Sequence, residues 1–135
     1  MKTFAVQAIE IPANYERAFA YIADPATLPD WAHAFQSVDG AAAVMATPAG
    51  SISVKLTVKS SAEHGTIDWF IEFPDGSRAA AFSRVLRGAN GRSIYTFTLM
   101  PPPVPLEQLE GALEQQSQTL RRELAALARI LGSQT

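Results

Sequence analysis

The stretch LEQLEGALEQQSQTLRRELAALARIL, residues 106–131, carries the clearest structural pattern in this chain. Its seven leucines follow one another in steps of three, four and, once, seven residues. This spacing places them along one face of a long α-helix. The step of seven skips an inward position, which Gln116 occupies with Ser117 beside it. A long helix with one apolar face needs a large concave partner to cover that face.

The residues before this helix alternate between apolar and polar side chains, which is typical of β-strands. We predict six strands, at residues 3–11, 37–47, 51–59, 66–73, 78–87 and 93–100. Turn signals separate the last five strands: Pro48-Ala49-Gly50, His64-Gly65, Pro74-Asp75-Gly76 and Asn90-Gly91. Strands joined by tight turns pair antiparallel, and the first strand must join them because a single strand is not stable. Such a sheet twists and curls, which supplies a concave face.

Two short helices are expected between the first and second strands. Helical spacing of apolar residues predicts the first over residues 13–23, directly after Pro12. Asp24 and Pro25 suit the start of a second over residues 26 to about 35, interrupted near Pro29. A connection rich in proline, Pro101–Pro105, leads to the long helix. The predicted fold is an α+β domain spanning residues 1–135, with a curved antiparallel six-stranded sheet wrapped around the C-terminal helix.

Composition excludes several classes of function. The chain has 135 residues, a net charge of −2 and scattered basic residues, so it has no nucleic-acid-binding pattern. It has no cysteine, which excludes disulfides, thiolate metal sites and a catalytic thiol. No stretch approaches the roughly 20 apolar residues of a membrane span, and no leader is evident. We therefore expect a cytoplasmic protein without membrane insertion. We expect no cofactor, and no metal site, because two histidines placed this way are too few for zinc.

Residues 9–31 contain three short motifs: IEIPA at 9–13, ERAFAYIADP at 16–25 and LPDW at 28–31. These motifs resemble those of the START-like or SRPBCC superfamily, also called the helix-grip or Bet v 1-like fold. Ala18 stands where the family frequently has valine. The element order matches over nearly the whole chain.

The resemblance implies a hydrophobic cavity between the sheet and the C-terminal helix. Members of this superfamily bind lipids, sterols, polyketides or plant hormones there. Some are polyketide cyclases or aromatases, others are hydroxylase domains, and others are co-chaperone modules related to the activator of Hsp90 ATPase. The matched residues shape the scaffold, so no catalytic residue is carried over with them.

We expect the chain to bind an apolar or amphipathic small molecule, such as a lipid, a polyketide or an aromatic compound. This function requires a cavity of roughly 300 Å³ or more. The residues expected to line it lie on inward strand faces, on the second short helix and on the leucine face: Trp31, Val54, Leu56, Trp69, Ile71, Ala81, Ser83, Tyr95, Phe97, Leu113, Gln116 and Leu120. The chain is expected to be a monomer or a homodimer.

Two other functions remain open. A cyclase or dehydratase would need at least two of Tyr95, His33 and Arg84 to converge on one cavity wall. A protein-interaction module would instead show an exposed apolar patch of several hundred Å² without an internal cavity. No catalytic residue can be named from the sequence.

Two of these side chains, His33 and Arg84, have competing interpretations. We favour a surface position for His33, because no acid is clearly placed to orient it. Arg84 points inward if Phe82 does, and outward if Ala81 and Ser83 point inward. We favour the outward direction, because arginine is rarely buried unpaired.

Tyr95 is expected to face inward, where its hydroxyl must find a partner in a ligand, a water or another side chain. Gln116 either faces a wet or ligand-filled cavity or reaches solvent, and the two alternatives are equally compatible with the sequence.

Overall fold

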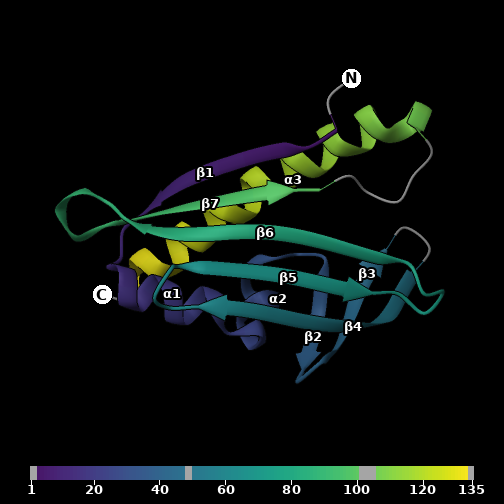
Figure 1. Ribbon diagram of the computed structural model, residues 1–135, viewed down its shortest axis with the longest axis horizontal. Coiled ribbons are helices and arrows are strands. Elements are labelled where there is room, and N and C mark those ends of the chain that lie inside the picture. The colour runs from purple at the N-terminus through teal and green to yellow at the C-terminus, as the bar shows by residue number, and fades with distance from the viewer. Residues whose placement is uncertain (1–2, 48–49, 101–105, 134–135) are drawn as a thin grey trace.

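The computed structural model describes residues 3–47, 50–100 and 106–133. Its seven strands form one antiparallel sheet in the order β1-β7-β6-β5-β4-β3-β2 (Figure 1). The strands are β1 (Ala5–Ile11), β2 (Phe35–Asp39), β3 (Ala42–Thr47), β4 (Gly50–Ser61), β5 (Thr66–Glu72), β6 (Arg78–Arg87) and β7 (Ser93–Leu99). The helices are α1 (Tyr15–Ala23), α2 (Leu28–Trp31) and α3 (Leu106–Ser133), with short 3₁₀ turns at Pro25–Thr27 and Ala89–Gly91.

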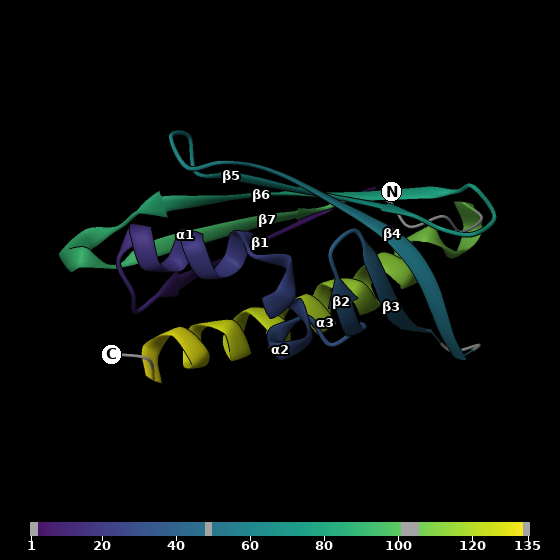
Figure 2. The ribbon, with the colours of Figure 1, turned by 90° about the horizontal axis from the view of Figure 1, so that it is seen from below.

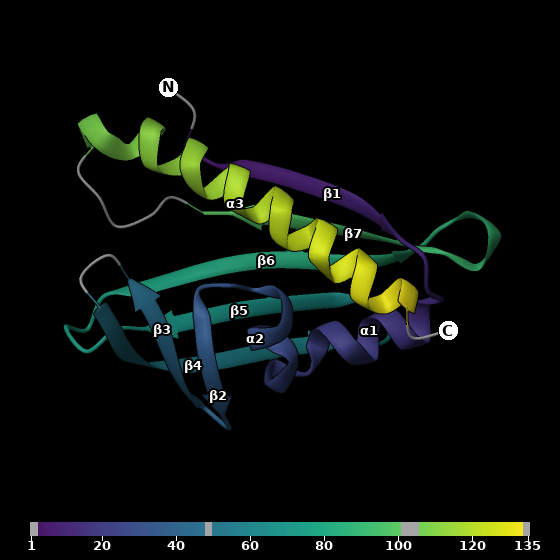
Figure 3. The same cartoon turned by 180° about the vertical axis from the view of Figure 1, so that it is seen from behind.

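All three α-helices lie on the same side of the sheet (Figure 2). Strand β4 bends out of the plane of the central strands, and the β2–β3 hairpin lies on the same side as the helices. Helix α3 runs diagonally across β1 and β7 when the molecule is seen from behind (Figure 3). This is the predicted helix-grip arrangement, and the predicted fold class is confirmed.

The predicted strand count of six was wrong, because residues 37–47 form a hairpin and not one strand. Asp39 ends β2 and Ala42 begins β3. Gly40, between them, has a φ of 61°, which suits glycine in a tight turn. The second predicted helix is also shorter than expected, because α2 ends at Trp31 and Phe35 already belongs to β2.

The interior lies between the sheet and the helices. On the sheet, alternate residues of the central strands point inward and are buried, among them Ile67, Val85 and Tyr95. On α3, the buried residues are Leu113, Leu120, Leu124, Ala126, Leu127 and Leu131. The predicted leucine face therefore packs inward wherever its side chains are described. The side chains of Leu106 and Leu109, positions 48–49 of the predicted turn and the predicted connection at 101–105 lie outside the described residues.

Gln116 is exposed, so of its two alternatives the structure has the one that reaches solvent, and Gln116 is not a cavity-lining residue. Its neighbour Ser117 takes the inward position and is half-buried. The side-chain amide of Gln7 on β1 donates a hydrogen bond to Ser117 Oγ at 2.7 Å. The polar break in the leucine face is therefore a direct contact between α3 and the edge strand β1.

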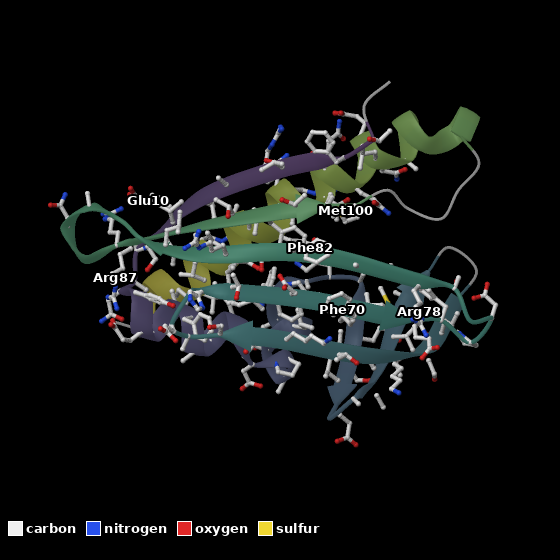
Figure 4. All side chains as sticks on the ribbon, viewed as in Figure 1. Glu10, Phe70, Arg78, Phe82, Arg87 and Met100 are labelled. Carbon is white, nitrogen blue, oxygen red and sulfur yellow. The ribbon has the colours of Figure 1, made fainter. Side chains whose placement is uncertain are left out.

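The opposite face of the sheet is not covered by a helix of the described chain and carries several apolar side chains. Figure 4 shows Phe70, Phe82 and Met100 on this outer face. The rings of Phe70 and Phe82 meet edge to face, with centroids 6.0 Å apart. Phe4, Val6, Phe82 and Met100 are the exposed large apolar residues of the described chain.

Candidate functional site

The structure brings most of the predicted cavity residues together on the inner side of the sheet. Gln116 is exposed, and Leu113 is buried but lies outside the main core cluster. Those that are buried are Trp31, Val54, Leu56, Trp69, Ser83, Tyr95, Phe97, Leu113 and Leu120. Ile71 and Ala81 are half-buried and pack against this core. The alternation of the strands explains this result, because inward residues two apart share one face.

A small polar cluster lies within this apolar interior. The Trp69 indole N–H donates to Ser83 Oγ at 3.3 Å, and the Ser83 hydroxyl donates to the Ile67 carbonyl at 2.6 Å. Strands β5 and β6 fix these contacts, because Ile67 pairs directly with Ser83 in the sheet. The indole of Trp69 and the hydroxyl of Ser83 therefore both have a partner for their protons.

Two further polar groups in the interior have no such partner. The Tyr95 side chain is 0% exposed and Trp31 is 2% exposed. Their rings meet edge to face, with centroids 6.4 Å apart. Neither the Tyr95 hydroxyl nor the Trp31 indole nitrogen has a hydrogen-bond partner among the described residues. A buried polar group left in this way costs about 1 to 3 kcal/mol, so the pair marks a position where a binding partner would stabilise the protein.

Burial also fixes the ionisation state of Tyr95. Removal from water raises the pKa of its phenol far above the usual value, and this effect dominates. Ser83 and Trp69 lie near enough to lower the pKa slightly, although neither makes a hydrogen bond of acceptable geometry with the hydroxyl. Tyr95 therefore remains a neutral phenol that can donate a proton to an acceptor.

Exposure of the inward face increases toward one end of the sheet. On β5, Ile67 and Trp69 are buried whereas Ile71 is half-exposed. On β6, Val85 and Ser83 are buried whereas Ala81 and Ala79 are half-exposed, and on β7 the same change occurs between Phe97 and Leu99. The three strands thus become accessible to solvent at the same end, beside the β5–β6 turn at residues 73–77.

A surface pocket of about 500 Å³ lies elsewhere, where α1 begins, next to the β6–β7 turn. It is lined by residues 12–14, Arg17 and residues 90–92. None of the predicted cavity residues belongs to it.

The three side chains considered for catalysis do not converge. Arg84 is exposed on the outer face, where its Nε donates to the His64 carbonyl at 3.0 Å. His33 is exposed after α2. Only Tyr95 points into the interior, so this structure does not assemble the pair that a cyclase mechanism would require.

Sequence reasoning missed one acidic residue beside the interior. Glu123 on α3 accepts a hydrogen bond from the His33 backbone N–H at 2.6 Å. Burial raises the pKa of Glu123, and the contacts with His33 and Arg122 only partly oppose this effect. Its position directly before Leu124 on the leucine face was the available clue.

Among the described residues, no three His, Asp or Glu side chains are grouped so that they could hold a metal ion. A search of the helices in the described ranges finds none with the length and apolar character needed to cross a membrane.

No protein-family model and no curated protein matches the sequence. Solved structures do resemble it over nearly the whole chain. The protein XoxI from Bacillus cereus has a TM-score of 0.71 at 19% identity, with 96% of each chain covered. A START superfamily protein from Mycobacterium smegmatis has a TM-score of 0.71 at 12% identity, with 99% of this chain and 100% of that chain covered.

A third solved structure is the di-domain ARO/CYC BexL from the BE-7585A biosynthetic pathway. It has a TM-score of 0.71 at 17% identity, with 96% of this chain covered. The match covers 46% of BexL, about half of that larger chain. At these identities the similarity is one of fold.

Proposed function

Because this chain has the START-like fold, also called the Bet v 1-like or helix-grip fold, we propose that the interior between the sheet and α3 binds a small apolar or amphipathic molecule. The inward face of β4 to β7 is almost entirely apolar, and its residues are held in fixed positions by the sheet. A preformed apolar surface with a few polar groups is the usual character of a small-molecule site.

The observation that carries this proposal is the change in burial along β5, β6 and β7. A sheet face that serves only as a core is expected to be buried along its whole length. Here Ile71, Ala81 and Leu99 face inward but remain half-exposed beside the β5–β6 turn. We propose that an apolar molecule enters at this end of the interior, toward Trp69 and Tyr95.

We propose binding and not catalysis, because only one of the three candidate catalytic side chains faces the interior. BexL is described as an ARO/CYC protein of a biosynthetic pathway. Polyketide-like aromatic compounds are therefore one ligand class to include in a screen, together with lipids.

The test uses a neutral apolar fluorophore, N-phenylnaphthylamine, titrated into the purified protein. We expect saturable binding of one probe per chain. Ala81→Phe should weaken binding about tenfold or more, because the larger side chain occupies space that the probe needs. Ala80→Phe is the matched control, because Ala80 is the next residue of β6 and points to the outer face.

Circular dichroism would show that both variants fold. Equal binding by the two variants, or no saturable binding by the unchanged protein, would contradict the proposed site. Native mass spectrometry of the freshly purified protein would reveal any molecule that co-purifies.

A further inference from the structure

We infer that the interior selects neutral molecules that carry an acceptor oxygen, such as a ketone or ester carbonyl, and that the Tyr95 hydroxyl and the Trp31 indole N–H hold that oxygen. This inference rests on the proposed binding function and names the chemistry of the ligand. It is carried by the two unpartnered donors and by the charges of the groups around them.

The first step concerns what the two groups can bind. An indole N–H donates a hydrogen bond and cannot accept one. A neutral phenol donates one proton and can also accept. Trp31 therefore requires an acceptor from its partner, and a carbonyl oxygen has two lone pairs that can serve Trp31 and Tyr95 together. A hydrocarbon without an acceptor would leave both donors unsatisfied.

The second step concerns the neighbouring polar groups. Ser83 already donates to the Ile67 carbonyl and accepts from Trp69. These bonds direct the Ser83 proton and the Trp69 indole N–H to protein atoms and away from a ligand. The unused donors of this cluster are therefore those of Tyr95 and Trp31.

The third step concerns charge. No lysine, arginine or histidine is a buried residue of the described chain. The Nη1 atom of Arg17 is buried without a partner, but Arg17 lines the separate surface pocket where α1 begins. The titratable group nearest the interior on α3 is Glu123, whose carboxyl would repel an anion whenever it is ionised. A carboxylate or phosphate placed beside Tyr95 would lose its water without gaining a positive partner, which is strongly unfavourable. A cation would face two donors and, as acceptor, only the neutral phenol oxygen of Tyr95, so a neutral ligand is favoured over either charge.

The experiment uses three probes of equal chain length: a methyl ketone, the corresponding alkane and the corresponding fatty carboxylate. Each competes with N-phenylnaphthylamine for the full-length protein. We expect the ketone to bind more tightly than the other two. Tyr95→Phe should lower ketone affinity about three- to tenfold, the effect of one hydrogen bond, and should leave alkane affinity unchanged.

Tyr15→Phe is the matched control for this substitution. The Tyr15 hydroxyl donates to the Ala62 carbonyl, and its ring lies against Arg87. Tyr15→Phe should therefore leave the preference for ketone intact.

An infrared readout separates a direct contact from an indirect one. The carbonyl stretch of the bound ketone should lie at a lower frequency in the unchanged protein than in Tyr95→Phe, because a hydrogen bond weakens the C=O bond. A merely structural role of Tyr95 would not move this frequency.

The outcomes separate the inference from the proposed function on which it rests. If the alkane binds as tightly as the ketone, or the carboxylate binds more tightly, the inference is wrong while binding in the interior stands. The inference also fails if Tyr95→Phe lowers ketone and alkane affinity equally, or if the carbonyl stretch is the same in both proteins. If none of the probes binds, the proposed function fails.

Discussion

At the scale of single residues, the hydroxyls of two buried tyrosines are expected to affect stability in opposite directions. Tyr95 has no partner for its hydroxyl, whereas Tyr15 donates to the Ala62 carbonyl. In the ligand-free protein, Tyr95→Phe should raise the free energy of unfolding by about 1 kcal/mol, because it removes an unsatisfied buried group. Tyr15→Phe should lower the free energy of unfolding by about 1 kcal/mol, because the Ala62 carbonyl loses its partner.

Urea unfolding followed by circular dichroism measures both changes in free energy. Equal losses in the two variants would mean that the Tyr95 hydroxyl is already satisfied in the free protein, for example by a bound water.

Glu123 is expected to make stability depend on pH. Its pKa is raised in the folded protein above the ordinary value of 4.5. Between that value and the folded pKa, the native state binds more protons than the unfolded state, so the free energy of unfolding falls as pH rises. Glu123→Gln should remove this fall of the free energy of unfolding with pH. Urea unfolding at several pH values from about 4.5 upward measures it.

Glu114, which is exposed on the same helix, provides the matched control. Glu114→Gln should leave this fall as it is in the unchanged protein. If the free energy of unfolding of Glu123→Gln still falls as pH rises, another titratable group causes this dependence.

At the scale of elements, the contact between Gln7 and Ser117 fixes α3 against β1. Ser117→Ala should lower the free energy of unfolding by about 1 kcal/mol, because the half-buried Gln7 amide loses its acceptor. Gln116→Ala, one position away on the exposed side, should change this free energy by no more than about 0.5 kcal/mol. Thermal and urea unfolding would compare the two, and a larger effect at Gln116 would contradict the helix orientation described above.

Two turn glycines are expected to differ in their tolerance of alanine. Both have positive φ angles, 61° at Gly40 and 77° at Gly65. A Cβ at Gly40 would meet no atom within 4 Å, so Gly40→Ala should cost only the backbone penalty of about 1 to 2 kcal/mol. A Cβ at Gly65 would lie 2.2 Å from the Val85 carbonyl oxygen, which adds a clash with the backbone of β6.

Gly65→Ala should therefore lose clearly more stability than Gly40→Ala, as measured by the midpoint of urea unfolding. Similar losses would show that the β4–β5 turn can move away from β6 at little cost.

The same elements show how far sequence reasoning could reach. Alternation and turn residues predicted the bounds of β5, β6 and β7 closely, because turn signals separate these strands and because apolar and polar residues alternate in β5 and β7. The turn at Gly40 was missed because the three alanines that follow it, at 41–43, blurred that contrast. Helical spacing could not choose between Gln116 and Ser117, since both lie three or four residues from a leucine on either side. The choice depended on the partner that Gln7 supplies from a distant strand.

The sequence could predict which face of the sheet carries the candidate site, but not which side chains meet there. Period-two alternation placed Trp69 and Tyr95 on the inner side of the sheet. For Ser83 the choice also needed the rule that arginine is rarely buried unpaired, which turned Arg84 outward. The contact of Tyr95 with Trp31 joins β7 to α2, and no local pattern encodes it. The missing partners of these two groups could be recognised only once the surrounding residues were in place.

At the scale of the whole molecule, the one-sided arrangement of the helices separates two surfaces. The inner face meets α3 and carries the candidate site, whereas the outer face shows Phe70, Phe82 and Met100 (Figure 4). A ligand in the interior should stabilise the complete fold by mass action, because it binds only when sheet and helix are together. The melting temperature should rise with ketone concentration in the unchanged protein and in Ala80→Phe, and should rise clearly less at the same concentrations in Ala81→Phe.

The pairing of β1 with β7 has a consequence for how the protein is made. Ala5 lies opposite Leu99, so β1 has no partner strand until nearly the entire sheet has been synthesised. The strands from β2 to β7 pair with their neighbours in order, and each new hairpin can close as it emerges. Strand β1 and helix α3, which contact each other through Gln7 and Ser117, come together only at the end. The nascent chain therefore keeps its interior open until translation of the domain is almost complete, and long-range closure of this kind is slow.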